Sequence, residues 1–283
     1  MISYADAHGS ALGDSILATP RRLNVEQQRR LERFLAIESS LRQRLIDPGG
    51  TRLRFNQSYV RASEIAEQYY CEKKVDLTRQ YGRVETETKR QGSEGHESLQ
   101  AESIEVERTE MLEEIFSGGS IIVQELPLLA EHRGVVLAGQ PDAVIFKDGL
   151  PVALLEVKFS KSPFPYRSYH VQARIYGKIL DGAGFDTSDL CYVIAVAPRE
   201  SRGDVRLFRR VIEAMKESSG AESFEVDGVH VYVHDYSQPV AESDLEWALE
   251  YWMGAREATP VDNMAKCRSC EYSEKCSNYS KSV

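Results

Sequence analysis

Two carboxylates stand at places where apolar segments would ordinarily carry none. Asp142 opens the apolar run 143–146, and Glu156 interrupts the end of the run 151–157. A turn at 147–149 separates the two runs, so paired strands would bring both acids to the end of the hairpin that lies away from the turn. Carboxylate oxygens that converge at strand ends form an oxygen-rich site for a hard cation such as Mg2+.

A lysine joins this acid pair. Alternate side chains of a strand share a face, so Glu156 and Lys158 should point to one side while Val157 points into the core. An ammonium group beside metal-bound carboxylates can orient a water, help to deprotonate it, and stabilise the charge that develops on a phosphate. The set suits phosphodiester hydrolysis. The alternative is a salt bridge, in which Lys158 neutralises Glu156 and Asp142 caps a turn.

The cysteines indicate a second kind of chemistry. Of the five cysteines, Cys267, Cys270 and Cys276 lie close together near the end of the sequence, and Cys71 lies far from them. An odd count makes a disulfide framework a poor explanation, and metal ligation a better one. Four thiolates can hold either Zn2+ or a 4Fe-4S cluster, and the spacing alone does not separate these two. Cys191, within an apolar run, is most simply a buried core residue.

Helices and strands must position these groups. Periodicity and turn residues predict helices over 24–46, 63–77, 166–181, 204–217 and 241–256, with a Glu-rich helix pair over 83–116. Ser63 is the expected N-cap of the helix that carries Cys71 along its length. Apolar runs predict strands within 120–129, 134–147, 151–159, 190–197 and 230–234, and residues 1–22 look irregular. This order of elements predicts a mixed α/β fold with a central mixed sheet.

Five blocks in one order resemble the PD-(D/E)XK nuclease superfamily. More narrowly, they resemble its RecB-like iron–sulfur exonuclease branch, which includes the CRISPR-associated nucleases that trim new spacers. The blocks are Gly92-Ser-Glu-Gly-His96, Pro141-Asp142, Glu156-Val157-Lys158, Gln172-Ala-Arg-Ile-Tyr176, and the cysteines Cys71, Cys267, Cys270 and Cys276. Each block is weak alone, but the ordered set spans roughly residues 56–279 and is far more specific than any member.

The resemblance implies roles for the residues in these blocks. His96, Asp142, Glu156 and the Val157 carbonyl would hold one or two Mg2+ or Mn2+ ions, and Lys158 would orient or activate the attacking water. Gln172 and Tyr176 would position the scissile phosphate or support Lys158. The four cysteines would hold a 4Fe-4S cluster, because a zinc ribbon usually pairs one Cys-x2-Cys with another. Glu125 is either a further metal ligand or a solvated acid on an edge strand.

The resemblance also implies an architecture and an activity. It predicts an N-terminal extension over 1–50 and a nuclease domain over 51–283, with a restriction-endonuclease-like core of a mixed sheet flanked by helices and a C-terminal cysteine cluster tail. The activity would be metal-dependent exonucleolysis of single-stranded DNA ends. CRISPR adaptation is the expected setting, with the CRISPR integrase as a partner. The alternatives are a stand-alone repair exonuclease of the exonuclease V type and a non-catalytic iron–sulfur DNA-binding module. One departure is Glu72, where the branch often has a proline after its first cluster cysteine.

Charge and hydropathy limit the partners. The net charge of −9 argues against histone-like coating of DNA, but local basic residues remain available to grip a phosphate backbone. The candidates for that grip are Lys161, Arg167, Arg174 and Lys178. No apolar stretch approaches the roughly 18–20 residues that span a bilayer, and the first residues lack the pattern of a signal peptide. A cytoplasmic protein without a membrane partner is therefore expected.

Overall fold

A mixed sheet forms the centre of the computed structural model, which describes residues 2–6, 23–47, 53–84, 104–201, 204, 206–218 and 220–277. Its strands, in spatial order, are β10 (Ser223–Val226), β11 (Val229–Asp235), β9 (Cys191–Ala197), β8 (Leu150–Phe159), β7 (Ala143–Lys147), β4 (Ser120–Gln124), β1 (Ile2–Asp6) and β3 (Ile104–Val106). Only β8 and β9 run parallel, and the other neighbours are antiparallel. The predicted mixed α/β fold is confirmed.

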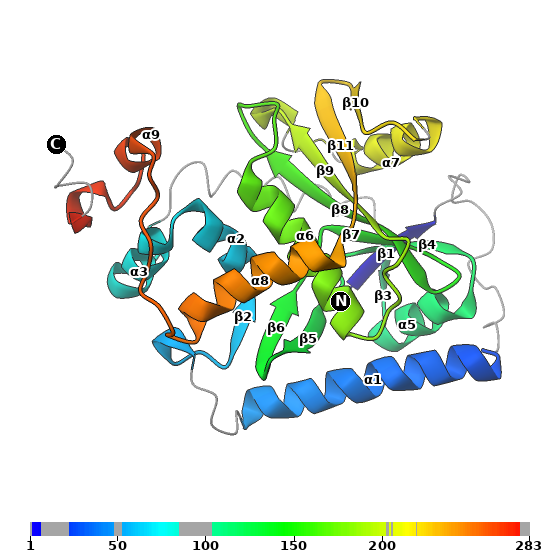
Figure 1. Ribbon diagram of the computed structural model, residues 1–283. Coiled ribbons are helices and arrows are strands. Elements are labelled where there is room, and N and C mark those ends of the chain that lie inside the picture. The colour runs from blue at the N-terminus through cyan, green and yellow to red at the C-terminus, as the bar shows by residue number, and fades with distance from the viewer. Residues whose placement is uncertain are drawn as a thin grey trace.

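Helices cover both faces of this sheet. They are α1 (Val25–Ile46), α2 (Ala62–Tyr70), α3 (Glu72–Tyr81), α5 (Arg108–Ser117), α6 (Arg167–Gly182), α7 (Leu207–Glu217), α8 (Gln238–Trp252) and the short α9 (Met264–Arg268). A second sheet, in the order β2 (Tyr59–Arg61), β6 (Val135–Gly139) and β5 (Leu128–His132), lies beside α6. Figure 1 shows α2, α3 and α9 gathered at one end of the molecule, with α7, β10 and β11 toward the other. None of the described helices is long and apolar enough to cross a bilayer.

Alternation along β8 divides the interior into two cores. Leu154 belongs to the larger core, which α6 enters with Val171 and Ile175. Val157, with the opposite orientation, belongs to the smaller core beneath α7. Apolar residues on both faces are the pattern expected of a central strand covered by helices on each side. Glu156 and Lys158 interrupt this pattern only on the face toward α6.

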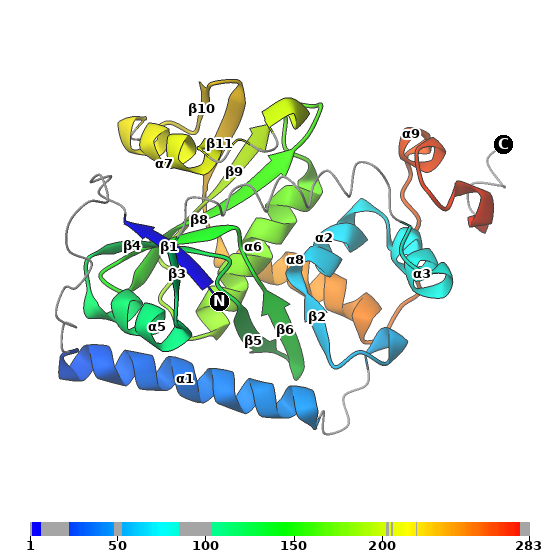
Figure 2. The same cartoon turned by 180° about the vertical axis from the view of Figure 1, so that it is seen from behind.

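Helix α1 runs along one side of the molecule, as Figures 1 and 2 show. The Asn24 side chain accepts hydrogen bonds from the backbone of Glu26 and Gln27, which supplies the N-cap of this helix. Leu31 and Phe34 are buried in the larger core, so the predicted amphipathic helix is confirmed. The proposed boundary near residue 50 stays a prediction, and α1 shares its core with the rest of the chain.

Several predicted elements differ from the structure. Residues 2–6, expected to be irregular, form β1 between β3 and β4. Of the predicted helix pair at 83–116, the structure has only α5, preceded by the strand β3, while 85–103 lie outside the described residues. The elements β2, β10 and α9 are additional. Strands of three to five residues carry too little periodicity to be recognised, and their partners determine them.

The predicted helix at 63–77 is two helices that meet at Cys71. This residue has φ −172° and ψ 115°, an extended conformation that ends α2 and precedes α3. The predicted Ser63 N-cap is also wrong, because the N-cap of α2 is Arg61, two residues earlier, and the Glu64 carboxylate accepts from the Arg61 backbone N–H. Cys71 therefore lies at a joint between helices and not along one helix.

Candidate active site

The hairpin of β7 and β8 brings Asp142 next to Glu156. Ala143 pairs with Leu155, so Asp142, just before β7, lies beside Glu156 across the hairpin. The Asp142 Oδ2 atom accepts a hydrogen bond of 2.7 Å from the backbone N–H of Val157. Glu156 has only 2% of its surface exposed. The two carboxylates that the sequence singled out therefore meet at one point of the sheet.

Lys158 links these acids to helix α6. Its Nζ atom lies 2.5 Å from Glu156 Oε1 and donates to Gln172 Oε1 at 3.2 Å. The Gln172 amide in turn donates to the Tyr176 hydroxyl at 2.9 Å, one helical turn further along α6. Gln172 and Tyr176 are both buried. The structure thus joins the strand block and the helix block in one hydrogen-bonded chain.

The electrostatics of the site keep Lys158 protonated. Burial alone would lower the pKa of Lys158, but the neighbouring Glu156 and Asp142 carboxylates outweigh it, and the pKa is raised. Burial, reinforced by the Glu156 charge, also raises the pKa of Tyr176. Both groups consequently keep their protons at neutral pH. An ammonium group held in this way can orient a water or stabilise negative charge.

Gly139 allows α6 to lie close to the second sheet. A Cβ atom at this position would come within 2.8 Å of Tyr176 Cδ1 and 2.9 Å of Ile179 Cδ1. Contacts this short do not occur between real side chains, so Gly139 is needed for the position of the Tyr176 ring. Sequence analysis missed this residue, although the glycine at the start of the Gly-Gln-Pro-Asp turn was a usable signal.

Glu125 lies next to Asp142, whereas His96 falls outside the described residues. The backbone N–H of Glu125 donates to the Asp142 carbonyl at 3.2 Å. Glu125 adopts a φ of 50°, in the left-handed region that is uncommon for a residue with a side chain. A strained backbone conformation beside an acid pair fits a functional position. The roles of both residues as metal ligands stay predictions.

A groove of about 960 Å3 opens beside the lysine. Lys158, Tyr169 and Gln172 lie in its wall, and the basic side chains along it are Arg61, Lys74, Arg79 and Arg83. Sequence analysis missed these four, because α2 and α3 bring them to the site from an earlier part of the chain. Lys74 and Arg79 are ion-paired with Glu271 and Glu64, and Glu64 and Glu67 also line the groove. The charges of Arg61, Arg83 and Lys158 suit a polyanion that passes the lysine.

Two of the predicted backbone-gripping residues lie elsewhere. Arg174 forms an ion pair of 2.5 Å with Asp244, and Lys178 forms one of 2.9 Å with Glu242. Both acids belong to α8, so these cations hold α6 against α8. The guanidinium of Arg167 lies 4.9 Å from the Tyr69 ring centre. The basic run along α6 is thus largely used for packing, which a sequence pattern does not distinguish from binding.

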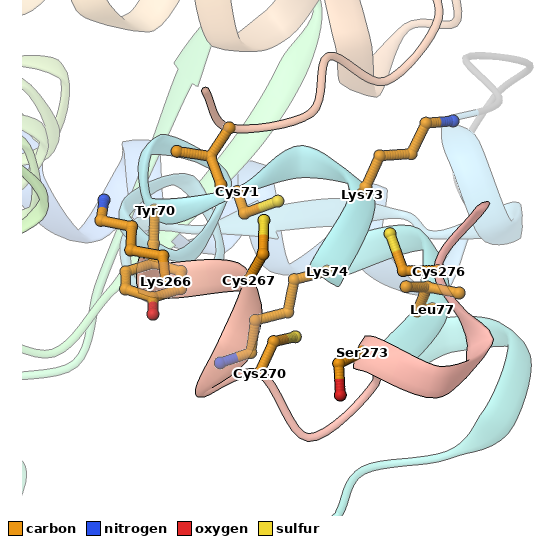
Figure 3. Close-up of a pocket in the computed structure, with 11 residues that line it drawn as sticks. Tyr70, Cys71, Lys73, Lys74, Leu77, Lys266, Cys267, Cys270, Ser273 and Cys276 are labelled. Atoms are coloured by element: carbon orange, nitrogen blue, oxygen red, sulfur yellow. The ribbon is translucent and has the colours of Figure 1, made fainter. Parts of the chain in front are cut away.

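The four predicted cluster cysteines line one pocket. Cys71, at the joint of α2 and α3, meets Cys267, Cys270 and Cys276 of the C-terminal segment around a small cavity of about 30 Å3. Figure 3 shows the sulfur atoms of Cys71 and Cys267 facing one another. Tyr70 and Lys74 line both this pocket and the basic groove, so the two share a wall. Cys191 lies apart, on β9, where it packs against the smaller core.

Side-chain contacts hold the C-terminal segment, and the residues just before it, on α3. Lys74 pairs with Glu271 at 3.3 Å, and the buried Tyr272 donates its hydroxyl proton to the Gly82 carbonyl at 2.6 Å. Glu72, directly after Cys71, is 1% exposed, and its two oxygens accept from Arg256 at 2.6 and 2.7 Å. A proline here would lack this carboxylate, so the departure at Glu72 has a structural role in this chain.

A separate group of possible metal ligands lies between β5 and α8. One ligand atom each of His132, Glu242 and Glu246 lies within 4.8 Å of the others. Glu242 is already paired with Lys178, and Glu246 with Arg133. These two cations offset the charge that would attract a metal ion. The group is distinct from the acids on β7 and β8.

Comparison with known proteins points to nucleases. A family described as exonuclease V, a 5′ deoxyribonuclease, matches residues 210–279, which include the three C-terminal cysteines but not the acids of β7 and β8. No curated protein matches the chain. A solved structure titled "Crystal structure of SSO0001" is similar at 14% identity with a TM-score of 0.46, over 87% of this chain and 97% of that one. The family match covers well under half of this chain, and it supports its interpretation as a DNA exonuclease.

Proposed function

We propose that this chain is a metal-dependent DNA exonuclease that hydrolyses phosphodiester bonds at single-stranded DNA ends. The observation that carries the proposal is the hydrogen-bonded set of Asp142, Glu156, Lys158, Gln172 and Tyr176, of which Lys158 and Gln172 line the basic groove. A purely structural salt bridge explains the contact of Lys158 with Glu156. It does not explain why hydrogen bonds extend from Lys158 to Gln172 and on to Tyr176, or why Lys158 lies beside the groove.

The donor set fits a hard divalent cation. Asp142 and Glu156 place two carboxylates against one ammonium group, which leaves negative charge for a cation to balance. His96, Asp142, Glu156 and the Val157 carbonyl would hold Mg2+ or Mn2+. Such an ion supplies a Lewis acid and a more acidic water. Lys158 donates to the attacking water or the phosphate, Gln172 fixes the direction of the lysine, and Tyr176 fixes the amide of Gln172.

The spacing of the four thiols supports a 4Fe-4S cluster over zinc in this pocket. A tetrahedral zinc site with Zn–S bonds of about 2.3 Å holds its sulfurs roughly 3.8 Å apart. Among the described residues, which include all four cysteines, no three thiols lie within 4.8 Å of one another. A four-iron cluster is wider and holds its ligand sulfurs further apart. The cluster would fasten the C-terminal segment to the joint at Cys71.

The setting of the activity has two candidates. The match to exonuclease V favours a stand-alone exonuclease, and because that family is described as a 5′ deoxyribonuclease, 5′ ends are the first to test. CRISPR adaptation, with the integrase as a partner, rests on the resemblance of the motifs alone. Both settings use the same chemistry at Glu156 and Lys158. Binding to the purified integrase would distinguish them.

Cleavage of end-labelled DNA tests the proposal. Single strands labelled at the 5′ or the 3′ end, with a circular single strand as control, are incubated with Mn2+, Mg2+ or EDTA. Wild type should degrade the linear strands only with a metal, whereas Glu156→Gln and Lys158→Met should leave them intact. Glu213→Gln, at an exposed position on α7, is the matched control and should cut normally.

Two outcomes would contradict the proposal. Full activity in both site variants would remove Glu156 and Lys158 from the mechanism. DNA binding that is equal with Mn2+ and EDTA, without cleavage of any strand, would instead identify a binding module.

A further inference from the structure

Two aromatic side chains are exposed on the loop that connects β8 to α6. Phe164 has 68% of its surface exposed and Tyr166 has 50%. They follow Lys158 by only six and eight residues. Exposure of a phenylalanine ring to water costs free energy that burial would recover, so a ring held outward beside a candidate site needs an explanation.

The structure of the loop holds Phe164 in this position. Pro163 and Pro165 flank it, and each proline ring restricts its own φ. The Phe164 backbone N–H donates to Ser162 Oγ at 3.3 Å, and the Tyr232 hydroxyl donates to the Pro163 carbonyl at 3.2 Å. The loop is therefore braced from both sides, and the ring is presented outward at low entropic cost.

Ring contacts connect this loop to the candidate active site. The Tyr166 and Tyr169 rings meet edge to face, with centroids 5.3 Å apart. The Tyr169 ring in turn lies 5.5 Å from the Lys158 ammonium. Tyr169 and Lys158 both line the basic groove. The exposed Tyr166 ring is thus connected through Tyr169 to the wall of the groove, and Phe164 lies two residues before Tyr166.

The charges around the loop indicate what it binds. No aspartate or glutamate occurs between Glu156 and Asp181, whereas Lys161 and Arg167, both exposed, flank the two rings in the sequence. Flat apolar surfaces between positive charges suit a ligand that combines aromatic faces with negative charge. Unpaired DNA bases on their phosphate backbone have this combination, and bases stack on aromatic side chains with little dependence on sequence.

We propose that Phe164 and Tyr166 form a stacking platform for the unpaired bases next to the phosphate at Lys158. The inference rests on the proposed function for the identity of the polymer, and it adds the element that distinguishes a flexible single strand from a duplex. Bases stacked within a duplex have no free face to offer. The platform therefore makes single-stranded DNA the preferred substrate.

DNA binding without cleavage tests this inference. Fluorescence anisotropy in EDTA measures the dissociation constant of a labelled single strand and of a strand of equal length with abasic sites. We expect Phe164→Ala and Tyr166→Ala each to weaken binding of the normal strand about tenfold and to leave the abasic strand unchanged. Phe164→Trp should restore binding. Val240→Ala, at an exposed apolar position on α8, is the matched control and should bind as wild type.

The outcomes separate this inference from the proposed function. Equal losses on normal and abasic strands, or no loss on either, would overturn the platform whatever the cleavage assays give. Base-dependent binding in a protein that cuts no DNA would support the platform and overturn the nuclease. Both aromatic positions are exposed, so unchanged thermal unfolding of the alanine variants should accompany either result.

Discussion

The carboxylate–lysine site and the cysteine pocket are assembled in opposite ways. The first joins residues between Asp142 and Tyr176, on two paired strands and the next helix of the chain. The second joins Cys71 to a segment that begins near residue 264. A contact between residues that are near each other in the sequence closes a short loop and costs little conformational entropy. A contact between residues at opposite ends of the chain closes a long loop and costs more. The strand site is therefore preformed, and the cysteine pocket gains more from a bound group.

The two sites also differ in what holds them. Backbone pairing of β7 with β8 and of β8 with β9 positions the acids, and both cores pack against β8. The C-terminal segment is held by side chains, chiefly Lys74 with Glu271 and Tyr272 with Gly82. We expect changes in the first site to lower the cleavage rate even where the fold is kept, and changes in the second to act mainly through the fold.

The largest expected effect is on catalysis. Lys158→Met should lower the cleavage rate by about 10²–10³-fold, because the variant loses a charged donor at the reacting phosphate. Single-turnover cleavage with saturating enzyme isolates this step from binding. Unchanged rates would show that the ammonium serves only to neutralise Glu156.

A double substitution separates the salt bridge from the site. Glu156→Leu leaves the Lys158 ammonium buried without its partner and should cost about 3–5 kcal/mol of unfolding free energy. Glu156→Leu with Lys158→Met removes both charges, so it should recover most of this loss and remain inactive. Urea denaturation measures both. A stable double variant that still cuts DNA would contradict the assignment.

Cysteine substitutions should act on the cofactor and the fold together. Cys276→Ser should lose the absorption near about 400 nm that 4Fe-4S proteins show when purified without oxygen, and its C-terminal segment should be cut faster by protease. Cys191→Ser is the matched control, because Cys191 lies on β9 away from the pocket, and it should keep its colour. A colourless wild type that contains zinc would contradict the cluster.

Glu72→Gln should reduce stability by a smaller amount. The change weakens two charged hydrogen bonds from Arg256 and leaves that cation with only the more distant Glu250 as a counter-charge, at an expected cost of about 2–3 kcal/mol. Urea denaturation again measures the change. Glu213→Gln should leave stability within about 0.5 kcal/mol of wild type. Equal stability of the two variants would mean that Glu72 does not anchor the joint at Cys71.

Tyr272→Phe should have the smallest effect. It removes the hydroxyl that donates to Gly82 and accepts from the Val84 N–H, at a cost of about 1 kcal/mol, while the ring stays in place. Hydrogen exchange should rise at Val84 and along the C-terminal segment but not along β8. Faster exchange on β8 as well would show that the two sites unfold together.

Local patterns predicted the parts of the first site well. The apolar runs and the turn at 147–149 predicted β7 and β8, and alternation predicted that Glu156 and Lys158 share a face. The spacing of Gln172 and Tyr176 predicted one face of α6. These features depend on the period of a strand or a helix, and sequence encodes such periods directly.

Other features depended on which segments meet. The sequence showed a single helical pattern through Cys71, yet the helix is interrupted at that residue. Glu72 is bound by Arg256, which follows it by nearly two hundred residues. The basic residues of α6 were predicted to bind the DNA backbone. In the structure, Arg174 and Lys178 form ion pairs with Asp244 and Glu242 of α8. Residue types and spacing thus determined the chemistry available to this protein. Only the tertiary structure decided which charges remain for a ligand, because an ion pair depends on partners that sequence separation does not specify.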